Sequence, residues 1–171
     1  MKAAFLDRDG VINIDKNHVY KIEDFEFIEN IFPVCRKLLS LNYELFVVTN
    51  QAGIAKQLYT MNEFNKLTSW MLQIFSENNI NIRQVYYCPH HPDFTGQCLC
   101  RKPKPGMLLR AASDHDIDLK KSILIGDKMS DIEAGIASKL KINYLLTRIH
   151  KNKKIKNLIQ IQDLTEIFKF L

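Results

Sequence analysis

The segment Phe5-Leu6-Asp7-Arg8-Asp9-Gly10-Val11-Ile12-Asn13 places two carboxylates two positions apart, after an apolar run and before a glycine. Side chains alternate faces in an extended strand, so Asp7 and Asp9 can project on the same side. Gly10 then lets the backbone turn sharply away. Two carboxylates at the carboxyl end of a strand suit a hard cation such as Mg²⁺. One can attack phosphorus while its neighbour shuttles a proton, although an ordinary acidic turn has the same short pattern.

Strand-like and helix-like segments alternate along the rest of the chain. Runs rich in β-branched and aromatic residues predict five strands, at residues 2–6, 44–49, 84–88, 122–125 and 142–146. Apolar residues at helical spacing predict helices at residues 31–41, 61–77, 106–115, 130–138 and 163–171. Thr60 is a candidate N-cap of the second helix. This alternation indicates parallel βαβ units and therefore an α/β fold.

Polar residues directly follow three of these predicted strands, at Asp7 and Asp9, at Thr49 and Asn50, and at Asp127. Loops after parallel strands gather at one edge of a sheet, where open α/β sheets bind ligands. The Thr49 hydroxyl and the Asn50 amide can donate hydrogen bonds to phosphate oxygens. Asp127 can complete an Mg²⁺ site with Asp7 and the backbone carbonyl of Asp9. We therefore expect a single crevice that joins these groups.

Cations are supplied by the segment Arg101-Lys102-Pro103-Lys104-Pro105-Gly106-Met107 and by Lys128. The two prolines stiffen this segment and limit the directions of its side chains. Arginine can hold a phosphate through two hydrogen bonds, while lysine supplies a point charge. A solvated basic loop is the alternative interpretation of the segment taken alone. Asp131, close after Lys128, is assigned a supporting role in the first turn of a helix.

Three cysteines and two histidines gather between positions 88 and 100. The set best suited to a metal is a Cys3His group made of Cys88, His90, Cys98 and Cys100. This donor set matches a closed, tetrahedral, structural Zn²⁺ site, with His91 as the less favoured imidazole. In a reducing compartment such a cluster favours a metal over disulfides. Because the last cysteine adjoins Arg101, we expect zinc to anchor the loop that presents the cations.

Length and composition favour one domain. The chain has 171 residues, 46% of them hydrophobic, so residues 1–171 can bury one substantial core. The net charge of +5 fits a phosphorylated substrate, a nucleic acid or no particular partner, so it decides nothing alone. Part of this surplus comes from the basic run at residues 150–156, which we expect to be solvated. Cys35 lies in an apolar context and is expected to be a buried structural thiol.

The sequence gives no sign of a membrane or secretory segment. No stretch reaches the ~18 consecutive apolar residues of a membrane helix. The N-terminal residues lack the basic region, apolar run and cleavage site of a secretory signal. We therefore expect a cytoplasmic protein with no membrane partner, and a monomer.

Taken in order, the motifs resemble the haloacid dehalogenase superfamily of phosphatases. The motifs that carry the resemblance are D-x-D-G-V-I-N, V-T-N-Q-A-G-I-A, C-x-H-H-P, C-x-C-R-K-P-x-P-G-M and G-D-K-x-x-D. More narrowly, they resemble the D-glycero-D-manno-heptose 1,7-bisphosphate phosphatases, with the histidinol-phosphate phosphatases as close relatives. The match spans residues 3 to about 147. It implies a three-layer, doubly wound, Rossmann-like parallel sheet without a cap domain, into which the zinc loop 88–100 is inserted.

The resemblance also implies residue roles. Asp7 is then the nucleophile, Asp9 the general acid and base, and Mg²⁺ lies between Asp7, the Asp9 carbonyl and Asp127. The transferring phosphoryl group is held by Thr49, Asn50, Arg101, Lys102 and Lys128. Substrate binding is implied for Asp15, Lys16, Asn17, His18, Asn50, Gln51, Ala52 and Lys128.

The implied activity is removal of the C7 phosphate of a heptose 1,7-bisphosphate, a step toward nucleotide-activated heptose for surface polysaccharide. Asn13 and the wording of residues 50–55 favour this branch over histidinol phosphate, which remains an alternative. His18 and Ala52 differ from the tyrosine and serine that many heptose members carry, at positions near the sugar or distal phosphate. A third interpretation, a zinc-stabilised module that binds nucleic acid, leaves the acidic strand ends without a role.

Overall fold

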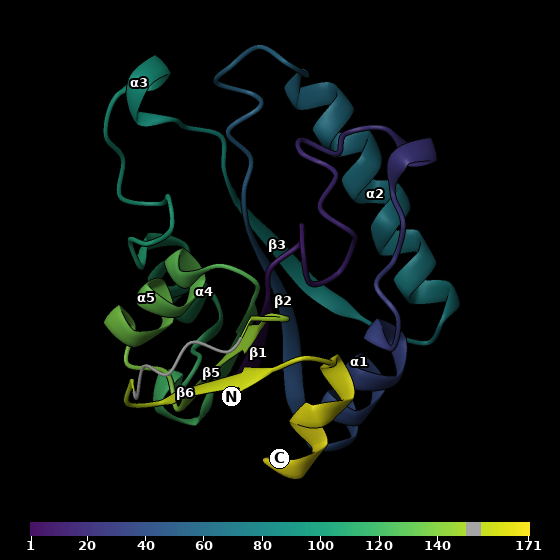
Figure 1. The fold of residues 1–171 in the computed structure, drawn as a ribbon, viewed down its shortest axis with the longest axis vertical. Helices are drawn as coiled ribbons and strands as arrows, with labels where there is room; N and C mark the ends of the chain where they lie inside the picture. Colours follow the sequence, from purple (N-terminus) through teal and green to yellow (C-terminus); the bar gives the residue numbers. More distant parts are fainter. Residues whose placement is uncertain (150–154) are drawn as a thin grey trace.

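The computed structural model describes residues 1–149 and 155–171 and contains one six-stranded sheet (Figure 1). Its strands are β1 (Lys2–Leu6), β2 (Tyr43–Asn50), β3 (Ile82–Cys88), β4 (Ile123–Gly126), β5 (Ile142–Leu146) and β6 (Leu158–Ile161). They lie in the order β3-β2-β1-β4-β5-β6, and every neighbouring pair is parallel. The α/β prediction with a parallel sheet is therefore confirmed.

Helices cover both faces of the sheet, which makes the fold three layers thick (Figure 1). The helices on one face are α1 (Ile31–Ser40) and α2 (Met61–Glu77), with the 3-10 helix η3 (Leu164–Lys169) beside them. Those on the other face are α4 (Gly106–His115) and α5 (Met129–Ala137). Alternate residues of β1 enter different cores, since Ala4 and Leu6 face α1 and α2 whereas Ala3 and Phe5 face α4 and α5.

The predicted boundaries of the central elements hold closely. Thr60 caps α2 as predicted, and its side chain and that of Glu63 form a capping box. Cys35 is fully buried in α1, as expected of a structural thiol. The remaining short elements are η1 (Ile22–Asp24), α3 (Pro92–Thr95) and η2 (Leu119–Lys121). The basic run predicted to be solvated lies largely outside the described residues, since positions 150–154 are not part of them.

Two predictions near the C-terminus are wrong. The sequence analysis assigns no strand after residue 146, yet β6 pairs with β5 over Leu158–Ile161. The predicted α-helix over 163–171 is the six-residue 3-10 helix η3. Its two buried residues, Leu164 and Ile167, are three positions apart, which matches the three residues per turn of a 3-10 helix.

In the sheet, β2 and β3 lie on one side of β1, and β4, β5 and β6 lie on the other. The order of the strands along the chain therefore changes direction between β1 and β4. At such a switch point the connections leave toward opposite faces and open a crevice at the carboxyl ends of the strands. Asp7 follows β1 and Asp127 follows β4, so both acids lie at this crevice. Among the described residues, no helix has both the length and the apolar character required to cross a membrane.

Candidate active site

A cleft of about 470 Å³ opens at the carboxyl edge of the sheet, where β1, β2 and β4 end. Most of the predicted catalytic and substrate-binding residues line it. These are Asp7, Asp9, Asp15, Asn17, His18, Thr49, Asn50, Gln51, Ala52, Arg101, Lys102 and Lys128. Segments that lie more than 100 positions apart in the sequence thus meet in one cleft, as the strand-end argument predicts.

Lys102 is the central cation of the cleft. Its ammonium lies 2.9 Å from Asp7 Oδ1 and 2.6 Å from Asp131 Oδ1, and it donates a 2.7 Å hydrogen bond to the Val48 carbonyl. Lys102 and Asp131 are both almost completely buried. Burial acts to lower the pKa of Lys102, but the two carboxylates outweigh it and raise that pKa. Lys102 therefore stays charged and compensates the negative charge beside Asp7.

Asp7 has one carboxylate oxygen engaged and one left for chemistry. Its Oδ1 accepts hydrogen bonds from the Arg8 backbone NH at 2.7 Å and from Lys102. Within the described residues no other hydrogen bond reaches its carboxylate, which leaves Oδ2 for attack on a substrate. Burial and then the nearby Asp131 raise the pKa of Asp7, and Lys102 opposes them. A further cation at this position would keep Asp7 ionised.

Three carboxylates, those of Asp7, Asp127 and Asp131, have oxygens within 4.8 Å of one another. Asp127 Oδ1 is buried and has no hydrogen-bond partner within the described chain. A buried carboxylate oxygen without a donor is costly unless a cation compensates it. Burial, opposed by Lys128 and reinforced by Asp131, raises the pKa of Asp127 to about 6. These donors are hard oxygens, so the residues fit Mg²⁺.

Gly10 allows Asp127 to come this close to the turn after β1. Its φ angle is +93°, and a Cβ at this position would lie 2.3 Å from Asp127 Cγ. Only glycine satisfies both conditions. The Cβ of any other residue would clash with the Asp127 carboxylate, and its backbone would be strained at this positive φ angle. The glycine after the paired acids therefore lets the turn after β1 approach Asp127, which follows β4.

The carboxylate of Asp9 is held by several donors. Arg8 Nη2 lies 2.8 Å and 2.9 Å from its two oxygens, and Arg8 is itself buried. Asn13 Nδ2 and Gln51 Nε2 add hydrogen bonds of 3.1 Å and 3.0 Å. Such a network fixes the orientation of the Asp9 carboxylate in the cleft.

The loop from Asp15 to His18 forms one wall of the cleft. Asp15 Oδ2 lies 2.8 Å from Lys128 Nζ, which joins this loop to the start of α5. Burial acts to raise the pKa of Asp15, but the contact with Lys128 opposes it and the pKa is lowered. Asn17 and His18 both have positive φ angles, and both line the cleft. Lys16 lies apart from the cleft lining, since its ammonium is paired with Glu26 at 3.3 Å.

Asn50 has a positioning contact that the sequence does not reveal. Its Nδ2 donates to the Lys102 carbonyl and its Oδ1 accepts from the Lys102 backbone NH, each at 3.1 Å. The amide thus fastens the basic loop to the end of β2. Arg101 Nη1 donates a 3.3 Å bond to the His90 carbonyl, which connects the same loop to the cysteine cluster.

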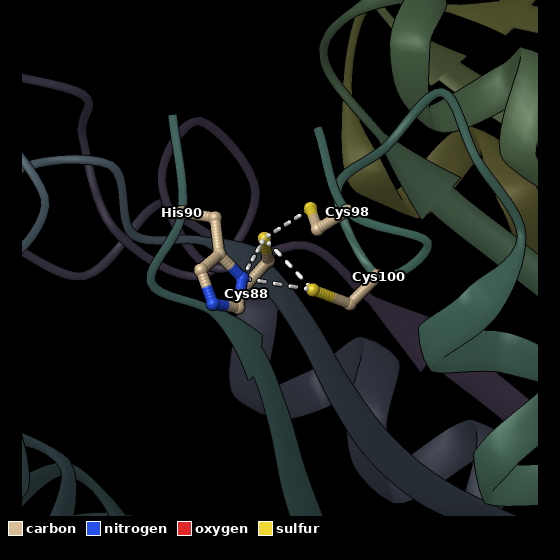
Figure 2. A group of neighbouring side chains, drawn as sticks. All are labelled: Cys88, His90, Cys98 and Cys100. Carbon is tan, nitrogen blue, oxygen red and sulfur yellow. Dashed lines mark hydrogen bonds between the residues drawn. The ribbon is translucent and has the colours of Figure 1, made fainter. Parts of the chain in front are cut away.

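The side chains of the Cys3His group converge on one point (Figure 2). Their donor atoms, the sulfurs of Cys88, Cys98 and Cys100 and Nδ1 of His90, are separated by 3.1 to 3.7 Å where contacts occur. With Zn–S bonds of about 2.3 Å, the edges of a tetrahedron are about 3.8 Å, so the cluster is of a size that closes around zinc. His91 instead accepts a hydrogen bond from the Asp93 backbone as the N-cap of α3.

Several cleft residues were missed by the sequence analysis. Lys56, Tyr59, Pro103 and Ser130 line the cleft, and Asp131 lies in it directly rather than only supporting a helix. Lys56 and Tyr59 come from the loop between β2 and α2. No motif or periodicity marks them. Their position within ten residues of the strand end Thr49 is the one signal that would have pointed to them.

Comparison with known proteins agrees with this geometry. The chain is 48% identical over 170 residues to a D-glycero-alpha-D-manno-heptose-1,7-bisphosphate 7-phosphatase of Campylobacter jejuni, with 99% of this chain and 95% of that protein covered. The chain belongs to the heptose-1,7-bisphosphate 7-phosphatase family. A family model described as HAD-hydrolase-like matches residues 99–167. The predicted family is thereby confirmed.

Other members of the family support the same assignment. The chain is 43% identical over 171 residues to the D-glycero-beta-D-manno-heptose-1,7-bisphosphate 7-phosphatase of Helicobacter pylori, with 99% of this chain and 97% of that protein covered. A crystal structure of D,D-heptose 1,7-bisphosphate phosphatase from B. bronchiseptica, complexed with magnesium and phosphate, has a TM-score of 0.84 and 24% identity over the whole of both chains. The doubly wound fold predicted from the sequence is thus shared with a solved structure of that name.

Proposed function

We propose that this chain removes the C7 phosphate of D-glycero-D-manno-heptose 1,7-bisphosphate through an aspartyl-phosphate on Asp7. The proposal is supported by one observation in a chain from this family: Asp7 and Lys102 meet in a single cleft, and an Asp127 carboxylate oxygen lies within 4.8 Å of one of Asp7. The relatives described above are named for heptose bisphosphate, which favours this substrate over histidinol phosphate. A phosphoric monoester is the substrate class in both cases.

In the first step, Asp7 Oδ2 attacks phosphorus and the bond between phosphorus and the C7 oxygen breaks. Asp9 gives its proton to that oxygen, so the sugar leaves as an alcohol. In the second step, Asp9 takes a proton from water, and the resulting hydroxyl attacks the phosphorus of the aspartyl-phosphate. The bond to Asp7 breaks and inorganic phosphate is released. Lys102, Arg101 and the Thr49 hydroxyl are placed to stabilise the charge on the phosphoryl oxygens.

Mg²⁺ would be held by the carboxylates of Asp7 and Asp127 and by the Asp9 carbonyl. The unpartnered Asp127 Oδ1 supports this set. When bound, the ion supplies positive charge that offsets the carboxylates and the phosphoryl oxygens. Zn²⁺ would be held by the Cys3His group of Cys88, His90, Cys98 and Cys100. Its proposed role is structural, because four protein donors leave no coordination position open to substrate.

The decisive experiment is a comparison of kcat/KM for phosphate release on both C1 anomers of heptose 1,7-bisphosphate and on histidinol phosphate. A strong preference for either heptose anomer supports the proposal and identifies the anomer. A preference for histidinol phosphate would overturn the substrate assignment. Asp7→Asn is the matched control, since it removes the nucleophile with little change of shape. Its turnover should fall to background while it stays folded and keeps its zinc content.

The remaining features of the proposal follow from the sequence. We expect a single domain that acts as a monomer in the cytoplasm, with neither nucleic acid nor membrane as a partner. The acidic groups at the ends of β1 and β4 favour this over nucleic-acid binding, because they repel phosphates unless a metal is bound.

A further inference from the structure

Tyr59 is a buried tyrosine that was not among the predicted site residues, and it contacts a polar side chain of the cleft. Tyr59 follows β2, is 4% exposed and lines the cleft. Its hydroxyl donates a hydrogen bond to Gln51 Oε1. Its ring stacks on that of Tyr20, with centroids 5.3 Å apart and planes inclined by 11°. Gly53 makes room for this ring, since a Cβ there would lie 2.1 Å from Tyr59 Cε1.

Gln51 passes this contact on to the catalytic groups. Its Nε2 donates to Asp9 Oδ2 at 3.0 Å and to Thr49 Oγ1 at 2.8 Å. The two ends of a glutamine amide have nearly the same shape, so packing alone does not select which end faces Asp9. A protonated phenol selects it, because its proton requires an acceptor and only the amide oxygen qualifies. Burial raises the pKa of Tyr59 to about 12, so its hydroxyl keeps this proton at neutral pH.

We propose that Tyr59 is a positioning residue for the general acid Asp9 and acts through the amide of Gln51. With the amide reversed, its oxygen would face Asp9, where it would repel the carboxylate form and accept a hydrogen bond from the acid form in place of the leaving oxygen. Asp9 would then be held by Arg8 and Asn13 without the Gln51 donor. This inference rests on the proposed function, because Asp9 is the acid of that reaction.

The test uses the dependence on the leaving group. Tyr59→Phe keeps the ring and its stacking on Tyr20 but removes the hydroxyl. We expect kcat/KM for heptose 1,7-bisphosphate to fall about tenfold, since its alkoxide must be protonated as it leaves. For p-nitrophenyl phosphate, whose phenolate leaves without a proton, we expect a fall of less than about twofold. Because kcat/KM ends at the first irreversible step, later hydrolysis of the aspartyl-phosphate does not enter.

Tyr20→Phe is the matched control. It alters the same stacked pair, but the Tyr20 hydroxyl makes no hydrogen bond within the described part of the chain. It should leave both values of kcat/KM unchanged. Gln51→Glu replaces the donor to Asp9 by an oxygen, so it should reproduce the selective loss. The double variant Tyr59→Phe/Gln51→Glu should lose no more than Gln51→Glu alone, because both act through one contact.

Equal losses on the two substrates, no loss, or additive losses in the double variant would each overturn the role of Tyr59. Melting temperatures of the variants separate this role from a general effect on folding, which lowers both activities together. Activity assays of the unmodified protein alone decide whether the proposed function is correct. If it hydrolyses histidinol phosphate and not the heptose bisphosphate, the substrate assignment falls. The leaving-group comparison is then made with histidinol phosphate, which also releases an alkoxide.

Discussion

Lys102 lies between Asp7 and Asp131 in a space that excludes water. Lys102→Met would leave two buried carboxylates without their shared cation. Breaking a buried ion pair on one side costs about 3–5 kcal/mol, so we expect a loss of that size in the free energy of unfolding at about pH 7.5. Urea denaturation of the magnesium-free protein measures it.

The same variant should show a pH dependence of defined sign. Burial already raises the pKa of Asp7, and without the opposing charge of Lys102 that pKa rises further above its value in the unfolded chain. The folded state then binds more protons than the unfolded state, so its stability increases as the pH falls. The deficit of Lys102→Met should therefore shrink between about pH 7.5 and pH 5. Lys120→Met, at an exposed lysine, is the control, and a deficit independent of pH would contradict the argument.

Asp127 links magnesium binding to pH. Its pKa is raised to about 6, chiefly by burial, whereas an unfolded aspartate titrates near 3.9. Between these values the folded, magnesium-free protein holds a proton that the unfolded chain lacks, so its own stability rises as the pH falls. Mg²⁺ must displace this proton. The affinity of the protein for Mg²⁺ should therefore fall about tenfold for each pH unit below about 6.

Calorimetric titration with Mg²⁺ at about pH 5, 6 and 7.5 measures this dependence. Asp127→Asn should bind Mg²⁺ weakly at all three values, because it lacks one carboxylate ligand. An affinity of the unmodified protein that does not change below pH 6 would exclude Asp127 as the group that titrates.

Among single residues of the site, the sequence predicts best those that directly follow a strand. Asp7, Thr49 and Asp127 follow strands directly, so an α/β pattern is enough to predict that they lie at the same edge of the sheet. Lys56 and Tyr59 reach the cleft from the middle of a loop. The path of a loop depends on contacts such as the stacking of Tyr20 on Tyr59, which no local pattern encodes. For this reason their place in the cleft could not be predicted.

Among whole elements, the segment between β3 and α4 is the one whose order we expect to depend most on a bound metal. Within the described residues its 17 positions, 89–105, form only the short helix α3, so backbone pairing contributes little to its order. Cys98→Ser should lower the zinc content below one per chain and reduce the melting temperature, since the free energy of zinc binding is coupled to folding.

The same change should lower kcat/KM, because Arg101 and Lys102 follow the last cysteine directly. Metal analysis and thermal unfolding of purified protein provide the measurement. Cys35→Ala removes the one cysteine outside the cluster, so it should keep full zinc while losing some stability from the core. Full zinc stoichiometry in Cys98→Ser would remove that cysteine from the ligand set.

Element boundaries were predicted well where two cores constrain them and poorly where burial is partial. The central strands are buried on both faces, so their apolar runs stand out in the sequence. In β6 only Ile161 is fully buried, and Gln160 interrupts the apolar pattern. The strand forms because it pairs with the edge of β5 that β4 leaves free. Such tertiary pairing overrides a weak local signal and is absent from any window of sequence.

Over the molecule as a whole, positive charge exceeds negative charge by five. The cleft is lined by four cations and four carboxylates, so this excess lies elsewhere, but two of the cleft cations, Lys56 and Arg101, form no ion pair within the described residues. A bisphosphate carries about twice the negative charge of a monophosphate at neutral pH, so it is attracted more strongly. Salt weakens this attraction, because the Debye length falls from about 10 Å at 0.1 M to about 3 Å at 1 M.

We therefore expect kcat/KM for heptose 1,7-bisphosphate to fall more steeply with sodium chloride than kcat/KM for p-nitrophenyl phosphate. Lys56→Gln should reduce the steeper slope, since it removes an unpaired cation from the cleft. Lys120→Gln changes the net charge equally but lies outside the cleft lining, so it should leave the slope nearly unchanged. If both variants reduce the slope alike, the net charge of the molecule attracts the substrate. If only Lys56→Gln does so, the attraction comes from the cations that the fold gathers at the carboxyl edge of its sheet.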